Sequence, residues 1–219
     1  MPTLPLIILL ILLSILPTNA TPPRPITTPK NPPKPRATWY NTFWTDTAAS
    51  VKYTNGAEGA YSVTWNGTGN FVGGKGWNPG STTKLISWTG TFAPQGYAYL
   101  TIYGWTTNPL IEYYIIENYH PSHEPAAPPE GEVVGNLTSD GSFYSVRTKM
   151  RVNKPSIVGT ATFRQIFSVR EVVRSEGVVT VGNHFAAWKE VGLKTGTHNY
   201  MVVATEGNNS SGKADIVVH

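Results

Sequence analysis

The sequence predicts an all-β domain, a sandwich or barrel of antiparallel strands that carries a single α-helix. From Trp39 onward, short runs rich in Tyr, Trp, Thr, Val and Ile alternate with Gly, Asn and Pro. Such runs are typical of short strands joined by tight turns. Only one segment has the period of a helix, and neither an internal repeat nor a second domain is evident. A lone helix among roughly a dozen strands excludes architectures in which helices cover a parallel sheet.

Each predicted strand is a run of apolar or aromatic residues that ends at a turn former. The clearest strands in chain order are Tyr61 to Trp65, Lys84 to Trp88, Tyr97 to Trp105, Ile111 to Glu117, Phe143 to Met150 and Thr160 to Arg170. The helix is expected over residues 183–192. Its apolar residues Phe185, Trp188 and Val191 share one face. Gly192 then provides a stop signal.

Residues 1–20 have the pattern of a secretory signal peptide. Leu6 to Leu13 is an unbroken run of Leu and Ile, and residues 18–20 offer small side chains for cleavage. An apolar segment of this length is shorter than the roughly 20 residues that cross a bilayer. We therefore expect a secreted, extracellular protein with no stable insertion into a membrane.

Residues 21–38 are expected to form a basic, proline-rich linker. Seven prolines fall between Pro22 and Pro35, which makes the segment extended and semi-rigid. The linker holds four of the 17 Lys and Arg residues of the chain. Residues 39–219 therefore carry 13 cations against all 13 Asp and Glu residues and are net neutral. Because the domain has no excess of basic residues, we expect no nucleic-acid partner.

Two glutamates, Glu112 and Glu206, lie in strand-like runs of aromatic residues. Side chains alternate between the faces of a strand, so Glu112 shares a face with Tyr114, and Glu206 with Tyr200. Carboxylates among aromatic rings, on a surface with little other charge, suggest two acids that face a sugar. Tyr and Trp rings suit the faces and hydroxyls of a pyranose, and the odd positions of residues 97–105 present a row of them. The pattern therefore predicts cleavage of glycosidic bonds.

Two other motifs resemble binding sites but lack a required part. Residues 69–76 nearly spell a phosphate-binding loop, yet Gly76 stands where Ser or Thr would hold magnesium. Residues 120–124 hold two His and one Glu in a proline-rich loop, whereas a zinc protease needs its histidines on a helix. We therefore expect neither a nucleotide site nor a metal site. Among the other carboxylates, Glu117 ends its strand and faces away from Glu112.

Seven sequence blocks follow one another through residues 39–219. They are Tyr61 to Trp65, Gly69 to Trp77, Tyr99 to Trp105, Pro109 to Tyr114, Arg151 to Ile157, Asn183 to Phe185, and Ala204 to Gly207 with Ser210 to Gly212. In this order they resemble glycoside hydrolase family 11, the small jelly-roll endo-β-1,4-xylanases. The resemblance implies a β-jelly roll sandwich of two twisted antiparallel sheets with one α-helix and a thumb loop. It also implies that residues 39–219 are the catalytic domain and that the protein is a monomer.

By the same resemblance, Glu112 is the nucleophile and Glu206 is the general acid/base. The implied reaction is hydrolysis of internal β-1,4-xylosidic bonds of xylan and xylo-oligosaccharides by a retaining double displacement, with the carboxyl groups about 5–5.5 Å apart. The charge of Glu112 raises the pKa of Glu206 and keeps it protonated until the glycosyl-enzyme forms. No metal or organic cofactor is implied.

The resemblance assigns substrate-binding positions to eight further residues. These are Tyr103, Tyr114, Asn70, Arg151, Pro155, Gln165, Trp44 and Tyr200. Tyr103 and Tyr114 match the pair that hydrogen-bonds the nucleophile and the reacting sugar. Asn70 matches the partner of the acid/base, and because an Asp there accompanies acidic optima, we expect a near-neutral optimum. Pro155 belongs to the thumb loop and Trp44 to a stacking platform.

Several residues depart from the family pattern. Arg164, Ile166, Phe167 and Asn208 stand where the family usually has Thr or aromatic residues, and the loop over residues 120–131 is atypical. The loss of rings predicts altered affinity for the sugar chain but leaves the acid pair in place. Three alternatives stay open at this point. The protein could be a non-catalytic carbohydrate-binding jelly roll, a β-1,4-glucanase, or a cell-surface elicitor that acts without turnover.

Overall fold

The computed structural model describes residues 38–219. The predicted signal peptide over residues 1–20 and all but the last residue of the predicted linker lie outside the described residues, so both stay predictions. Residues 38–219 contain thirteen strands, one α-helix and one short 3₁₀ helix. In chain order these are β1 (Tyr40–Thr45), η1 (Ala48–Ser50), β2 (Val51–Asn55), β3 (Ala60–Asn66), β4 (Asn70–Trp77), β5 (Leu85–Gln95), β6 (Ala98–Thr107), β7 (Ile111–Tyr119), β8 (Glu132–Ser139), β9 (Ser142–Ser156), β10 (Gly159–Arg170), β11 (Gly177–Thr180), α1 (Val181–Glu190), β12 (Thr197–Asn208) and β13 (Ser211–Val218).

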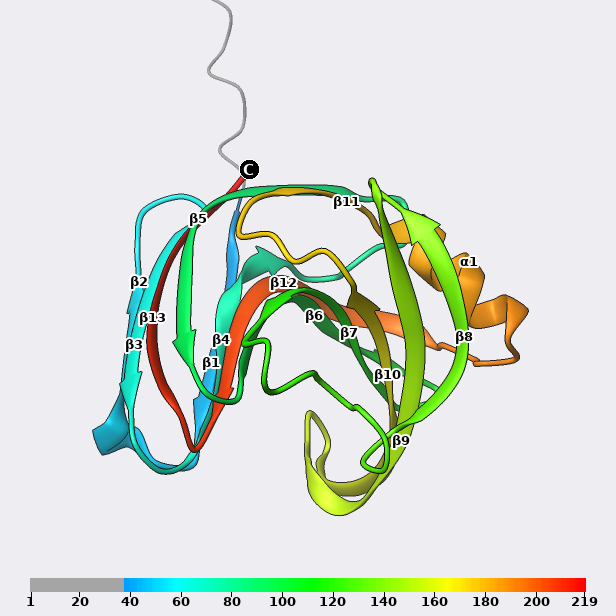
Figure 1. Cartoon of the computed structure of the whole chain (residues 1–219), viewed down its shortest axis with the longest axis horizontal. Helices are drawn as coiled ribbons and strands as arrows, with labels where there is room; N and C mark the ends of the chain where they lie inside the picture. Colours follow the sequence, from blue (N-terminus) through cyan, green and yellow to red (C-terminus); the bar gives the residue numbers. More distant parts are fainter. Residues whose placement is uncertain (1–37) are drawn as a thin grey trace, which may run out of the picture. The chain divides into compact units, whose positions relative to one another are not determined.

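The strands form two sheets that lie face to face (Figure 1). The larger sheet, of eight described strands, has the order β1-β4-β12-β6-β7-β10-β9-β8, and the smaller has the order β11-β5-β13-β3-β2. This arrangement confirms the predicted all-β jelly roll. Among the described strands, one pair departs from the expected antiparallel pattern, because β10 runs parallel to β7. The chain passes through β8 and β9 between these two strands, and such a long connection permits parallel pairing.

The apolar core lies between the two sheets. Along β6, Ala98, Leu100 and Ile102 point into this core, whereas Tyr99 and Tyr103 point to the opposite face of the larger sheet. Both faces of β6 are therefore buried, which explains why its sequence is apolar and aromatic throughout. The same alternation on β7 and β12 gives the larger sheet one face for the core and one aromatic face for a site.

The helix α1 begins earlier than predicted, at Val181, and ends at Glu190. Phe185 and Trp188 pack into the core, as their shared face predicts. Gly192 has a φ of 78°, a left-handed conformation that suits glycine and ends the helix. The start of the helix is tied to the β8–β9 turn, where the Asp140 carboxylate accepts bonds from the Thr180 backbone N–H at 2.9 Å and hydroxyl at 2.8 Å.

The hairpin of β9 and β10 is longer than the sequence predicts. β9 continues past Met150 to Ser156, and β10 begins at Gly159. Figure 1 shows this hairpin curling across the open side of the larger sheet. The tip holds its shape through Ser156, whose hydroxyl donates to the Gly159 carbonyl at 2.6 Å. This hairpin is the predicted thumb loop.

Candidate active site

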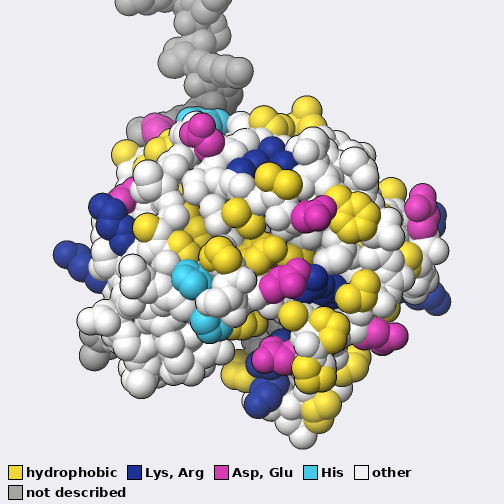
Figure 2. Space-filling view, viewed as in Figure 1, with side chains coloured by type: hydrophobic (Ala, Val, Ile, Leu, Met, Phe, Trp, Pro, Cys, Tyr) yellow, Lys and Arg dark blue, Asp and Glu magenta, His cyan; other side chains and the backbone are white. Residues whose placement is uncertain are grey.

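The concave face of the larger sheet forms a cleft of about 750 Å³. Figure 2 shows hydrophobic, basic and acidic side chains around a hollow in this face of the molecule. All ten site residues predicted from the sequence line the cleft: Trp44, Asn70, Tyr103, Glu112, Tyr114, Arg151, Pro155, Gln165, Tyr200 and Glu206. They come from seven different strands, which the sheet order brings together.

Glu112 is buried, with 8% of its surface exposed, and both of its carboxylate oxygens are hydrogen-bonded. The Tyr103 hydroxyl donates to Oε1 at 2.8 Å, and the Gln165 amide donates to Oε2 at 2.6 Å. Trp105 Nε1 in turn donates to the Tyr103 hydroxyl at 2.7 Å. Because the indole fixes the direction of the Tyr103 proton, the chain of bonds favours an ionised Glu112 held in one orientation.

Glu206 has a different environment, because only one of its oxygens is engaged. The Tyr99 hydroxyl donates to Oε1 at 2.6 Å. Oε2 is buried and has no hydrogen-bond partner among the described residues. Since Tyr99 donates to Oε1, the proton of a neutral Glu206 belongs on Oε2. Both atoms belong to a side chain that lines the cleft, so the proton can be given to a ligand there.

The two carboxyl groups differ in their electrostatics. Burial raises the pKa of Glu206 to about 8, the charge of Glu112 adds to this rise, and the bond from Tyr99 opposes it. Burial also raises the pKa of Glu112, but the bonds from Gln165 and Tyr103 oppose that rise. The hydrogen bonds to Glu112 therefore favour its ionised form, whereas the raised pKa of Glu206 favours its protonated form near neutral pH.

Three polar atoms at the cleft are buried without a hydrogen-bond partner in the described part of the chain. They are Arg151 Nε, Gln165 Oε1 and Glu206 Oε2. Unpaired buried polar groups are rare in folded proteins. Three of them on residues lining one cleft indicate a ligand that carries many hydroxyls, which can both donate and accept.

Aromatic rings line the cleft around the two acids. Trp44 on the edge strand β1 is 45% exposed, which leaves its ring free to stack on a sugar. Tyr114 lies between Tyr103, at a centroid distance of 5.1 Å, and Phe167, which stacks on it at 4.7 Å. Tyr200 contacts Tyr103 at 5.9 Å. These contacts lock the rings, so the shape of the cleft is fixed before a ligand arrives.

The structure places Asn70 in the cleft but does not give it the predicted contact. Its side-chain amide donates to Asp46 Oδ2 at 2.6 Å, and its backbone N–H donates to Asp46 Oδ1 at 2.6 Å. No hydrogen bond joins Asn70 to Glu206 among the described residues. The strand register puts Val72 opposite Glu206 and Asn70 opposite Asn208, so Asn70 lies diagonal to Glu206, and its amide is taken by Asp46.

Two of the departures from the family pattern do not affect the cleft. Ile166 points into the core between the sheets, so the change there alters core packing. The Arg164 guanidinium donates to the Thr148 hydroxyl at 3.0 Å and is absent from the cleft lining. Phe167 does line the cleft and supplies a ring that stacks on Tyr114. Asn208 lines it as well, and there an aromatic ring is missing.

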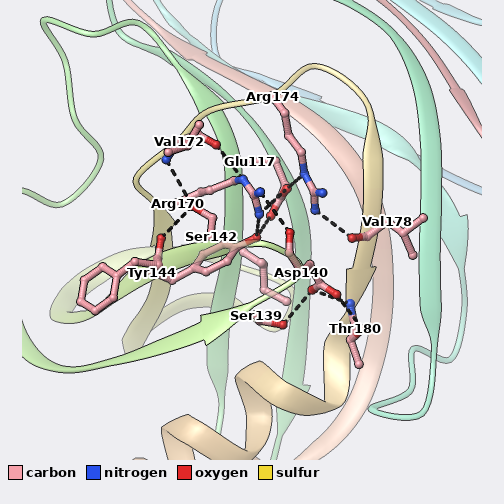
Figure 3. A network of polar contacts seen from close by, with 12 residues as sticks. Glu117, Ser139, Asp140, Ser142, Tyr144, Arg170, Val172, Arg174, Val178 and Thr180 are labelled. Carbon is pink, nitrogen blue, oxygen red and sulfur yellow. Dashed lines mark hydrogen bonds and ion pairs between the residues drawn. The ribbon is translucent and has the colours of Figure 1, made fainter.

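A second buried glutamate, Glu117, lies away from the cleft. Figure 3 shows its carboxylate between Arg170 and Arg174. Arg174 Nε donates to Oε2 at 2.5 Å, Arg170 Nη1 lies 3.9 Å from the same oxygen, and the Tyr144 hydroxyl donates to Oε1 at 2.7 Å. Because both carboxylate oxygens are held by arginines and a tyrosine hydroxyl, the role of Glu117 is structural. Its position confirms that it faces away from Glu112.

The loop over residues 120–131 is tied to the sheet by Arg147. This guanidinium donates to the Glu124 carboxylate and, at 2.9 Å, to the Pro125 carbonyl. Pro125 and Ala126 are buried, whereas His123 is exposed. Within residues 38–219, no group of three His, Cys, Asp or Glu side chains could hold a metal ion. Over the same residues, no helix has the length and apolar character needed to cross a membrane.

Three residues shape the site through contacts that the sequence does not predict: Tyr99, Asp46 and Lys149. Tyr99 stands in the predicted row of aromatic residues, but its bond to Glu206 depends on the pairing of β6 with β12. Asp46 directly follows β1 and lies beside Asn70 on the neighbouring strand β4. Lys149 shares a face of β9 with Arg151, so position parity alone could have placed it in the cleft.

Comparisons with known proteins agree with this geometry. Residues 36–217 match the sequence model described as glycosyl hydrolases family 11. Ethylene-inducing xylanase 1 of Botryotinia fuckeliana is 53% identical over 180 residues, or 82% of this chain and 63% of the relative. Endo-1,4-beta-xylanase B of Phanerodontia chrysosporium is 53% identical over 181 residues, or 83% of this chain and 61% of the relative. The chain thus spans less than two thirds of the length of either relative.

A solved structure gives the same result for the fold. It comes from a structural comparison of two major endo-1,4-beta-xylanases from Trichoderma reesei, and it is 44% identical in sequence to this chain. The superposition has a TM-score of 0.76 and covers 82% of this chain and 97% of the solved one.

Proposed function

Since the chain belongs to glycosyl hydrolases family 11, we propose that it is a secreted endo-1,4-β-xylanase that cleaves internal β-1,4-xylosidic bonds of xylan with retention of configuration. The observation that carries this proposal is the pair of unequal acids in one cleft. Glu112 is bonded at both oxygens, whereas Glu206 has a raised pKa and a free Oε2. The xylanase relatives support the choice of substrate.

In the first step, Glu206 acts as the general acid. Its Oε2 proton passes to the glycosidic oxygen as the bond to the anomeric carbon breaks, and a Glu112 oxygen attacks the same carbon. The negative charge of Glu112 is consumed in the ester bond of the glycosyl-enzyme. Tyr103 and Gln165, which hold the carboxylate before attack, keep it aimed at the anomeric carbon.

In the second step, Glu206 acts as the general base. The glycosyl ester of Glu112 is neutral, so the charge that helped to raise the pKa of Glu206 is absent. Glu206, left as a carboxylate when its proton passed to the leaving group, therefore stays ionised. It takes a proton from water as the water oxygen attacks the anomeric carbon, and the bond from that carbon to Glu112 breaks. Two displacements at one carbon give net retention. The chemistry is carried by the two acids, without a cofactor.

The rest of the cleft binds the sugar chain. The exposed ring of Trp44 offers a stacking surface, and Tyr200, Arg151 and Pro155 offer contacts on either side of the acids. Residues 154–157 of the thumb loop line one side of the cleft. We propose that the protein acts as an extracellular monomer, with residues 1–20 removed on secretion and residues 21–38 as a linker.

The test is release of reducing sugar from unsubstituted xylan by the purified chain. Glu112→Gln and Glu206→Gln are each expected to lower kcat by about 100-fold or more. The exposed Glu190 provides the matched control, since Glu190→Gln removes a carboxylate at the end of α1, away from the cleft. Proton NMR of the first product is expected to show the β-anomer.

Each alternative function gives a different result in this assay. A non-catalytic binding protein retains xylan in a pull-down but releases no sugar, and a β-1,4-glucanase releases more sugar from soluble cellulose than from xylan. Wild-type activity in Glu112→Gln or Glu206→Gln contradicts the roles given to these residues.

A further inference from the structure

A recess of about 400 Å³ opens beside the cleft, near the end of β12, where Asn208 and Asn209 follow Glu206 in the chain. We call it the side recess and define it by Tyr97, His123, Glu130, Lys149, Arg151 and Asn208. Tyr97, Lys149, Arg151 and Asn208 also line the cleft, so the two spaces are continuous. Its volume falls within the range of about 300–1,000 Å³ that is usual for small-molecule sites. It is large enough for one sugar unit that branches from a chain in the cleft.

The side recess presents cations whose donors are largely unused. Lys149 lies 3.9 Å from Glu130, the outer limit for an ion pair, and makes no hydrogen bond in the described structure. The Arg151 side chain makes neither an ion pair nor a hydrogen bond with the described residues. Its Nε is buried without a hydrogen-bond partner. Two cations with free donors, one of them a planar guanidinium, match the geometry and charge of a carboxylate.

Among the described residues that line the side recess, Glu130 is the only acidic one, so it would compete with a bound carboxylate for Lys149. Its ion pair with Lys149 is long, at 3.9 Å. Its side chain is 64% exposed, whereas that of Lys149 is 21% exposed. An exposed pair of this length contributes little to stability, so Glu130 can swing out when another carboxylate enters. Burial and, next, the charge of Arg151 lower the pKa of Lys149, whereas the charges of Glu130, Glu206 and Glu112 raise it. Bringing an anion between these two cations relieves their repulsion.

The walls of the side recess are formed before any ligand binds. The loop that carries His123 and Glu130 is held by Arg147 through Glu124 and the Pro125 carbonyl. The His123 ring also meets Tyr97 edge-on at 6.1 Å. A preformed recess avoids the entropy cost of ordering a loop on binding.

We propose that the side recess binds the carboxylate of a uronic-acid branch carried by the polysaccharide in the cleft. This inference rests on the proposed function. The sugar ring of the branch enters between Tyr97 and Asn208, and its carboxylate lies against Lys149 and Arg151. A neutral branch gains only ordinary hydrogen bonds there, whereas a carboxylate gains charge-assisted ones, which are roughly twice as strong. The protein therefore prefers acidic over neutral branches at this position.

The experiment compares two substrates that differ only in charge. Glucuronoxylan is assayed beside the same polymer after its carboxyl groups have been reduced to alcohols, and kcat/KM is measured on each. The readout is the ratio of the two values, acidic over reduced, because effects on the bond-breaking chemistry cancel in it. The wild-type ratio is expected to exceed one and to fall as salt is added, since salt screens the attraction.

Three variants of the full chain test the residues. Lys149→Met is expected to lower the ratio by about fivefold, the effect of losing one partly exposed charge pair. Lys149→Arg keeps the charge and is expected to hold the ratio within about twofold of the wild type. Glu130→Gln removes the competing anion and is expected to raise the ratio. A rise in Glu130→Gln supports the proposal even where Lys149→Met fails to fold.

The outcomes separate this inference from the proposed function. A wild-type ratio of one or less, unchanged by Lys149→Met and Glu130→Gln, overturns the inference while activity on the reduced polymer stands. No activity of the wild type on the reduced polymer overturns the proposed function itself.

Discussion

Tyr99 donates a hydrogen bond to Glu206 Oε1 at 2.6 Å, from the position directly opposite it on the neighbouring strand. This one contact does two things to the acid. It lowers the pKa of Glu206 against the larger effects of burial and of the Glu112 charge. It also occupies Oε1, so that the proton lies on the unpartnered Oε2. Tyr99 is therefore a positioning residue for the proton that the reaction uses.

Replacing Tyr99 with Phe removes the bond and keeps the ring. The pKa of Glu206 is expected to rise, because the anion loses a donor, and the alkaline limb of the kcat/KM profile moves up by about one pH unit. At the optimum kcat falls, since the second step needs the ionised form. A pH–rate profile of Tyr99→Phe beside the wild type measures both effects. If the alkaline limb of the Tyr99→Phe profile coincides with that of the wild type, the hydrogen bond from Tyr99 does not set the pKa of Glu206.

The contact between Asn70 and Asp46 predicts the effect of a carboxylate at position 70. Asn70→Asp sets two carboxylates against each other, so one of them takes a proton. With the proton on the new carboxyl group at position 70, that group can donate a hydrogen bond to its diagonal neighbour Glu206. Such a bond stabilises the ionised form of Glu206. The alkaline limb of the pH–rate profile is then expected to move down by about one unit from the near-neutral wild type.

The double variant Asp46→Asn, Asn70→Asp tests this cause. Without the neighbouring Asp46, the new carboxylate ionises at ordinary pH, and its charge raises the pKa of Glu206. The limb is therefore expected to return toward or above the wild-type position. Equal profiles for the single and double variants contradict the role given to Asp46.

The residues that the sequence predicts correctly are those whose placement depends on local rules. Alternation along one strand puts Glu112 beside Tyr114 and turns Glu117 to the other face, and the structure has both. The helix face of Phe185 and Trp188 follows from a period of 3.6 residues in the same way. These patterns need no knowledge of which strands pair.

The features that the sequence does not predict depend on pairing between distant strands. The bond from Tyr99 to Glu206 joins residues 107 positions apart, and that between Asn70 and Asp46 joins residues 24 apart. Register decides both, and a shift by one residue would turn each side chain to the other face. The parallel pairing of β10 with β7 is missed for the same reason.

The buried ion Glu117 is expected to matter for stability and not for chemistry. Glu117→Gln keeps the size of the side chain but leaves Arg170 and Arg174 without their anion (Figure 3). Breaking a buried pair in this way costs about 3 kcal/mol of the free energy of unfolding. Urea denaturation measures the loss, and kcat at low temperature is expected to stay at the wild-type value.

The surface pair of Lys213 and Asp215 is the control for Glu117. These side chains lie 3.1 Å apart and are 63% and 53% exposed. Lys213→Met is expected to change the free energy of unfolding by less than about 1 kcal/mol. If Glu117→Gln is no more costly than Lys213→Met, the buried network does not stabilise the fold.

His184 on α1 is expected to weaken the fold as the pH falls. The side chain is fully buried beside Tyr144, with a ring distance of 4.7 Å, and neither ring nitrogen has a hydrogen-bond partner among the described residues. Burial lowers the pKa of His184 from 6.5 to about 3. The unfolded chain therefore takes a proton below pH 6.5 that the folded chain refuses until about pH 3. The stability that His184 provides is complete above pH 6.5 and is lost as the pH falls through this window.

The measurement is the free energy of unfolding as a function of pH for the wild type and His184→Gln. One proton corresponds to a slope of about 1.4 kcal/mol per pH unit, and the variant is expected to lack that slope between about pH 6 and pH 4. Its absolute stability changes too, because the core packing differs, so the slope is the readout. His219→Gln removes an exposed imidazole and is the matched control variant. Parallel curves for His184→Gln and the wild type mean that the buried imidazole does not drive acid unfolding.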